Sequence, residues 1–93
     1  MSTLTDEKVI EIAKGVATAN NVNFASVVTA PAMDSAGSEA VEIKFLLTPG
    51  SSEAIMGETS ARTVSQLIQK LADAGEGRFP IVRYEEQVAS SRS

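Results

Sequence analysis

The segment from Ala40 to Thr48 constrains the fold most strongly. Large apolar side chains occupy every second position there and alternate with mostly polar ones. The apolar set is Val41, Ile43, Phe45 and Leu47. Because successive side chains of a strand point to opposite faces, this spacing predicts a strand with one buried and one wetter face. Such a strand needs neighbours to pair with and a layer to cover its apolar side.

Two segments with helical periodicity can supply that layer. The first is predicted to begin after an N-cap at Thr5 and to end at Asn20–Asn21, with Gly15 weakening it by about 1 kcal/mol relative to alanine. Its apolar stripe contains Val9, Ile12, Ala13 and Val16. The second is predicted to begin at Thr59 or Ser60 and to end before a left-handed Gly75. Its stripe contains Val64, Leu67, Ile68 and Leu71.

Two further strands are predicted, at Phe24–Ala30 and at Phe79–Tyr84. Pro31 should close the first, and Pro80 should lie near the start of the other or on an edge, because proline cannot donate to a ladder. A loop is expected over residues 32–38 and a turn at Pro49–Ser52, and Glu53–Met56 is a candidate for one short helical turn.

The resulting order, α-β-β-α-β, predicts an α+β fold. A right-handed split crossover through the second helix would place the third strand beside the first. The sheet is then antiparallel, in strand order 2-1-3, with both helices on one face. The length of 93 residues predicts a single domain, residues 1–93, with an ordered core at about 5–87 and a frayed tail at 88–93.

Cysteine and histidine are both absent from the sequence. Disulfides, thiolate nucleophiles and histidine bases are therefore excluded, and structural zinc is not expected. We expect a protein that is not an enzyme and that holds no cofactor and no metal.

The formal net charge is −4, which gives no basic footprint for a nucleic-acid backbone. Residues 1–7 have neither the basic nor the apolar region of a signal peptide, and no apolar run is long enough to span a bilayer. We therefore expect a cytoplasmic protein that binds neither nucleic acid nor membrane.

The sheet face away from the helices holds the candidate partner-binding residues. If Val41 to Leu47 turn their apolar set inward, Leu46 must point outward, and Val82 and Tyr84 are expected to do so on the last strand. The register of the first hairpin stays open: Val27 points outward if Phe24 and Val28 face the core, whereas an even pairing sum would expose Phe24. An apolar patch containing Val27, Leu46, Val82 and Tyr84 predicts a contact with another protein or with a second copy as a homodimer, with Glu42 and Lys44 at its rim. The function expected is therefore that of a non-enzymatic protein-interaction domain, a small acidic accessory or regulatory protein.

Two glycine-containing turns are weaker candidates for anion sites. Thr48–Ser52 joins a strand to a helix start, and Gly75–Arg78 offers an arginine beside two glycines. Both patterns favour ordinary turns and helix caps. Whether Pro49–Ser52 binds a ligand stays open.

The element order has one wider similarity. With a short helix at Glu53–Met56, the order helix-strand-strand-helix-helix-strand is similar to the type II KH nucleic-acid-binding domain. The GxxG loop of that family would fall at Gly57-Glu58-Thr59-Ser60, which lacks the second glycine and carries a glutamate. A degenerate KH-like module is thus the alternative function, although the close backbone approach to phosphate is not expected here.

Overall fold

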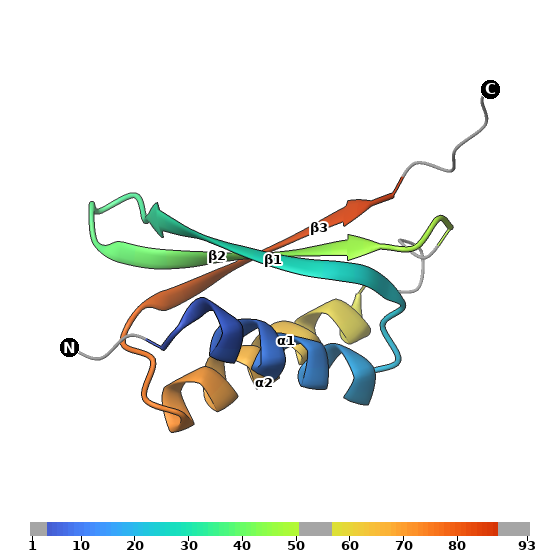
Figure 1. The fold of residues 1–93 in the computed structure, drawn as a ribbon, viewed down its shortest axis with the longest axis horizontal. Coiled ribbons are helices and arrows are strands. Elements are labelled where there is room, and N and C mark those ends of the chain that lie inside the picture. The colour runs from blue at the N-terminus through green and yellow to red at the C-terminus, as the bar shows by residue number, and fades with distance from the viewer. Residues whose placement is uncertain (1–3, 51–56, 88–93) are drawn as a thin grey trace.

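The computed structural model describes residues 4–50 and 57–87. Over these ranges the order is α1 (Asp6–Ala19), β1 (Phe24–Met33), β2 (Glu39–Leu47), α2 (Glu58–Asp73) and β3 (Phe79–Glu86). Figure 1 shows both helices on one face of the sheet, antiparallel to each other. The predicted α+β class and the single helical layer are therefore confirmed. The predicted helical turn at Glu53–Met56, part of the Pro49–Ser52 turn and the tail at 88–93 lie outside the described residues.

The strand order in the described sheet is β1-β2-β3, so the predicted order 2-1-3 is wrong. Strands β1 and β2 are antiparallel, but β2 and β3 are parallel, and the sheet is mixed. The reason lies in Pro31, which does not close β1 but lies inside it. A proline within a strand is tolerated at an edge and not between two neighbours, so β1 cannot be the central strand.

Strand β2 is the central strand, and its inward side chains are the most completely buried of the sheet. Val41, Ile43, Phe45 and Leu47 are all buried, as the alternation predicted. The Phe45 ring lies edge-on to Phe24 of β1, with centroids 6.4 Å apart, and stacks on Tyr84 of β3 at 5.6 Å. Contacts of this geometry stabilise aromatic pairs beyond their buried area. The strand with the largest inward aromatic therefore has a ring neighbour on each side.

The register of the hairpin is resolved by a bulge near its start. From Ser26 to Met33 the paired residue numbers of β1 and β2 have an even sum, with Val27 opposite Phe45, which turns Val27 inward and leaves Val28 outside. A register shift between Phe24 and Ser26 then returns Phe24 to the inner face opposite Leu47. One extra residue in β1 reverses the alternation of its side chains between the two faces of the sheet. Phe24 and Val27 therefore both face the core. Neither register foreseen from the sequence included a bulge.

The helix ends follow their capping residues. Thr5 caps α1 as predicted, its Oγ1 accepting a bond of 3.2 Å from the Lys8 N–H. Helix α2 begins earlier than predicted, with Gly57 and not Thr59 or Ser60 at the N-cap, where a φ of 62° takes the chain out of the helix. Gly75 has the left-handed φ expected of it, 100°. The Glu76 N–H donates to the Leu71 carbonyl at 2.9 Å, which completes a Schellman motif.

None of the helices in the described part of the chain is long and apolar enough to cross a membrane.

Candidate interaction site

The four residues predicted to form a patch on the open sheet face do not lie together. Val27 is 5% exposed and belongs to the core. Val82 pairs with Ile43 and Tyr84 pairs with Phe45 in the parallel ladder, so both share the inward face of β2. Of the four, only Leu46 points to the open face. The predicted outward orientation of Val27, Val82 and Tyr84 is therefore wrong.

The error on β3 arises from the choice of which side chains to bury. Outward Val82 and Tyr84 would require Phe79 and Ile81, at the alternate positions of the strand, to face the core. Instead Phe79 is 57% exposed, Ile81 pairs with the outward Glu42, and Pro80 is buried opposite Val41. Stacking of Tyr84 on Phe45 fixes the opposite alternation for the whole strand.

The open face of the sheet carries charges between its apolar residues. Leu46 lies between Ser26 of β1 and Glu85 of β3. The Lys44 Nζ lies 3.2 Å from a carboxylate oxygen of Glu85, and Arg83 approaches Glu42 at 3.1 Å, so that two ion pairs join β2 to β3. Exposed pairs of this kind stabilise little, but they fit a solvated surface. The patch of Val27, Leu46, Val82 and Tyr84 expected there is not formed, although Val28 and Phe79 are exposed on this face.

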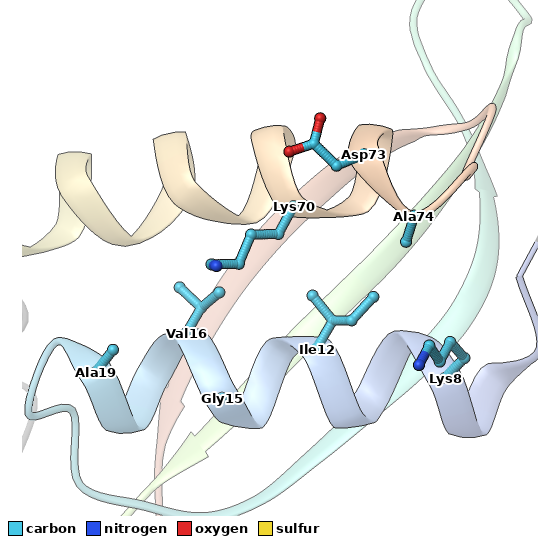
Figure 2. A pocket seen from close by; sticks show the side chains of 8 residues that line it. All are labelled: Lys8, Ile12, Gly15, Val16, Ala19, Lys70, Asp73 and Ala74. Carbon is cyan, nitrogen blue, oxygen red and sulfur yellow. The ribbon is translucent and has the colours of Figure 1, made fainter.

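An open groove lies instead on the other side of the molecule, between α1 and α2 (Figure 2). Its volume is about 580 Å³. The lining residues are Lys8, Ile12, Gly15, Val16, Ala19, Lys70, Asp73 and Ala74. A second hollow of about 450 Å³ shares Ala19, Lys70 and Asp73 and continues to Gln66 and Gln69. The two hollows make one depression along the helix pair, which we call the α1/α2 groove.

Gly15 is the residue of the groove that internal packing explains least. It lies inside α1 without the positive φ that would require glycine. Apart from its chain neighbours and the adjacent backbone of α1, a Cβ placed there would meet no atom of the protein within 4 Å. Glycine inside a helix costs about 1 kcal/mol relative to alanine, and here no described contact compensates for that cost. The glycine leaves backbone accessible at the groove.

The charged residues that line the groove are Lys8, Lys70 and Asp73. Figure 2 shows the Lys70 side chain extended between the helices toward Val16, whereas the Asp73 carboxylate points away from α1. Lys70 forms no ion pair or hydrogen bond with any described residue. Lys8, at the other end, lies 3.3 Å from the exposed Glu11. Lys70 is thus a cation beside apolar side chains with no anionic partner in the described structure.

Ile12 packs against the core, as its place in the apolar stripe predicted, but it is only partly buried, and sequence reasoning missed that it also lines this groove. The lining positions 8, 12, 15 and 19 recur at intervals of three and four residues, which places them on one face of α1. Gly15 and Ala19, two small residues on an exposed helical face beside Ile12, were the signal that could have indicated it.

The Gly75–Arg78 turn forms an internal ion pair and offers no free anion site. The Glu76 side chain is fully buried and accepts bonds from the Arg78 Nε at 2.9 Å, the Arg78 N–H at 2.8 Å and the Leu4 N–H at 3.1 Å. The bond from the Arg78 side chain is the main reason that the pKa of Glu76 falls to about 2, against the opposing effect of burial. This cluster, which we call the Glu76 clasp, ties the start of the chain to the α2–β3 turn.

The Tyr84 hydroxyl is buried and has no hydrogen-bond partner among the described residues. Burial raises the pKa of Tyr84, and an interaction with the Ser60 side chain offsets this in part without the geometry of a hydrogen bond. The residue therefore acts through its ring, stacked on Phe45, and not as a surface contact.

A metal site and a phosphate-binding loop are the two remaining kinds of candidate site. In the described residues no group of three or more Asp, Glu, His or Cys side chains could hold a metal ion. The segment Gly57–Ser60, at the position of the GxxG loop, opens α2 with an exposed Glu58 that lies 3.7 Å from Arg62. A carboxylate there opposes phosphate binding at this helix start.

No known protein family, curated protein or solved structure matches this chain.

Proposed function

We propose that this chain is a non-enzymatic protein-interaction domain, a small acidic accessory or regulatory protein, and that the α1/α2 groove is its contact surface. The observation that carries the proposal is Gly15. A destabilising residue faces an open, mainly apolar depression, and nothing inside the protein approaches it. Close approach of another chain to the α1 backbone would account for a residue without a side chain at this position.

The shape of the surface supports the same assignment. Ile12, Ala19 and Ala74 supply apolar area between the helices, with Val16 buried beneath them, and Lys8 and Lys70 supply polar groups at its margin. An apolar centre with a polar rim is the usual anatomy of a protein contact. The open sheet face also carries exposed apolar side chains, Val28 and Phe79, but two ion pairs, Lys44–Glu85 and Arg83–Glu42, lie among them.

The test is photo-crosslinking in living cells of the source organism. A benzoylphenylalanine at position 15 should give one discrete adduct with another protein, whereas the same residue at the exposed Ala30 of the open sheet face should not. The partner, purified and mixed with this chain, should bind in a fixed ratio. Gly15→Leu, which fills the groove, should weaken that binding at least tenfold.

The matched control is Leu46→Lys, which alters the open sheet face and should leave the affinity for the partner within twofold. An adduct at position 30 and none at position 15 would contradict the proposed surface. So would a partner whose binding is lost in Leu46→Lys and kept in Gly15→Leu.

A further inference from the structure

Strand β3 forms one edge of the described sheet, and its backbone groups point in a defined order. The Gln87 N–H donates to the Leu47 carbonyl of β2 at 2.8 Å. Because the backbone groups of successive strand residues point to opposite sides, the odd-numbered residues of β3 bond to β2 and the even-numbered ones point to the open edge. Pro80 fits this order, since its missing N–H then lies on the unpaired side. Val82 and Tyr84 therefore present their N–H and C=O groups to the edge.

The opposite edge of the described sheet, on β1, is interrupted in two places. Pro31 lies within that strand, and a register shift falls between Phe24 and Ser26. A proline and a bulge both hinder the pairing of an edge strand with another chain. Strand β3 has its proline at the second position, pairs with β2 without a register shift, and runs away from the helical layer in its second half (Figure 1). Residues 81–86, which we call the β3 edge, are thus the place where a further strand can add.

Charges of opposite sign lie on the outer face of the β3 edge. The side chains of Arg83 and Glu85 are 66% and 61% exposed. On the side of β2, Arg83 approaches Glu42 at 3.1 Å and Glu85 approaches Lys44 at 3.2 Å. The edge therefore presents a cation and, two residues later, an anion. A complementary strand must present an anion and a cation in the reverse order, and an antiparallel copy of β3 does so.

One register of two antiparallel copies satisfies both the charges and the backbone. A two-fold axis that keeps both helical layers on one side must pass through a residue that faces its own copy. An axis at Arg83 brings two guanidinium groups together, and an axis at Glu85 brings two carboxylates together, which is destabilising. An axis earlier in the strand places Pro80 inside the new ladder, where its missing N–H loses bonds. An axis at Tyr84 leaves Pro80 outside the ladder and places Arg83 of each copy opposite Glu85 of the other.

The register centred on Tyr84 also continues the contacts that β3 makes with β2. Arg83 and Glu85 face each other as a non-hydrogen-bonded pair, the kind whose Cα atoms are closer, at about 4.5 Å. Each such pair joins two existing ion pairs into a row of alternating charge, which runs from Glu42 and Arg83 of one copy to Glu85 and Lys44 of the other. On the inner face the Tyr84 ring lies beside the same ring of the second copy.

We propose that this chain forms a two-fold homodimer in which the β3 edges of two copies pair antiparallel, with Tyr84 on the axis, and join their sheets into one. This contact goes beyond the function proposed above and uses a surface separate from the α1/α2 groove.

Exchange of the two charges tests the contact by sedimentation equilibrium of the full chain. The wild type should form a dimer with a dissociation constant below about 100 µM. Arg83→Glu puts a glutamate opposite Glu85, and Glu85→Arg puts an arginine opposite Arg83, so each variant alone should dimerise at least tenfold more weakly. An equal mixture of the two variants should form a heterodimer of nearly wild-type affinity, because every facing pair is again of opposite sign.

Two control variants make the same charge changes away from the β3 edge. Arg62→Glu and Glu11→Arg alter exposed residues of the helices, and each should change the affinity of the dimer less than twofold. Gly15→Leu should also leave it within twofold, since the α1/α2 groove takes no part. Failure of the dimer and failure of the proposed function are thereby distinguished.

Introduced cysteines measure the register, because the sequence contains none of its own. Arg83→Cys mixed with Glu85→Cys should form a mixed disulfide in oxidised glutathione at least fivefold faster than Arg83→Cys mixed with Ile81→Cys, since only the first pair is opposed. A faster disulfide between positions 81 and 83 would overturn the inference. So would an association of the wild type weaker than the stated limit, a dimer that both charge variants retain, an equal mixture of those variants that stays monomeric, or a dimer that Gly15→Leu dissociates.

Discussion

Replacing Glu76 with glutamine removes the charge at the centre of the Glu76 clasp. The pKa of this carboxyl is about 2 in the folded chain, against an ordinary value of 4.5. The difference of about 2.5 units corresponds to roughly 3 kcal/mol. Because solvent reaches Arg78 at the edge of the clasp, screening reduces the expected loss of folding free energy at pH 7 to about 1–2 kcal/mol.

The sign of the pH dependence follows from the lowered pKa of Glu76. A carboxyl that is ionised more readily in the folded than in the unfolded chain stabilises the fold fully above about pH 5. The contribution is lost as the pH falls from about 5 to 2. The wild type and Glu76→Gln should therefore differ by about 1–2 kcal/mol at pH 7 and by much less at pH 2.

Urea denaturation followed by circular dichroism, repeated between pH 2 and 7, measures this difference. Glu11→Gln is the matched control, because it removes a carboxylate from the exposed pair with Lys8 and should change stability by less than about 0.5 kcal/mol. A difference between wild type and Glu76→Gln that is equal at pH 2 and pH 7 would refute the argument, as would a variant as stable as the wild type at pH 7.

Three other predictions concern the helix, the tyrosine and nucleic acid. Gly15→Ala should raise the free energy of unfolding by about 1 kcal/mol and Tm by about 4–8 °C in thermal denaturation, and an unchanged or lower Tm would show that the glycine has an internal role. Tyr84→Phe removes a hydroxyl without a described partner, so stability should be unchanged or higher by about 1 kcal/mol in urea denaturation; a loss above 1 kcal/mol would reveal a bond to that hydroxyl. The chain should bind single-stranded RNA or DNA no more tightly than about 100 µM in fluorescence anisotropy at low salt, since its charge of −4 removes the counterion-release contribution. Low-micromolar binding would instead favour the KH-like alternative.

Local patterns predicted most of the elements but not their arrangement. The alternation in β2, the N-cap at Thr5 and the left-handed Gly75 are set by residues near one another in sequence, and the structure confirms each of them. Strand order depends on which strands can lie only at the edge of the sheet. Pro31 carried that information, but it was interpreted as the end of β1 and not as a residue within an edge strand.

The candidate site was harder to predict, because each side-chain orientation depends on distant pairing. The bulge beside Ala25 and the stacking of Tyr84 on Phe45 decide which side chains of β1 and β3 face the core, and neither has a clear signal in the sequence. Leu46 was assigned correctly to the open face since its own strand fixes its orientation. The α1/α2 groove is formed by both helices together. The open space at Gly15 therefore depends on how the helices pack, which the sequence of α1 alone does not show.

The most direct test of the account is a map of backbone amide chemical shifts on the chain bound to its purified crosslinked partner. The account predicts the largest changes along the α1/α2 groove, at Ile12, Gly15 and Lys70, with small changes on the open sheet face. Changes centred on Val28, Leu46 and Arg83, with α1 unaffected, would contradict it.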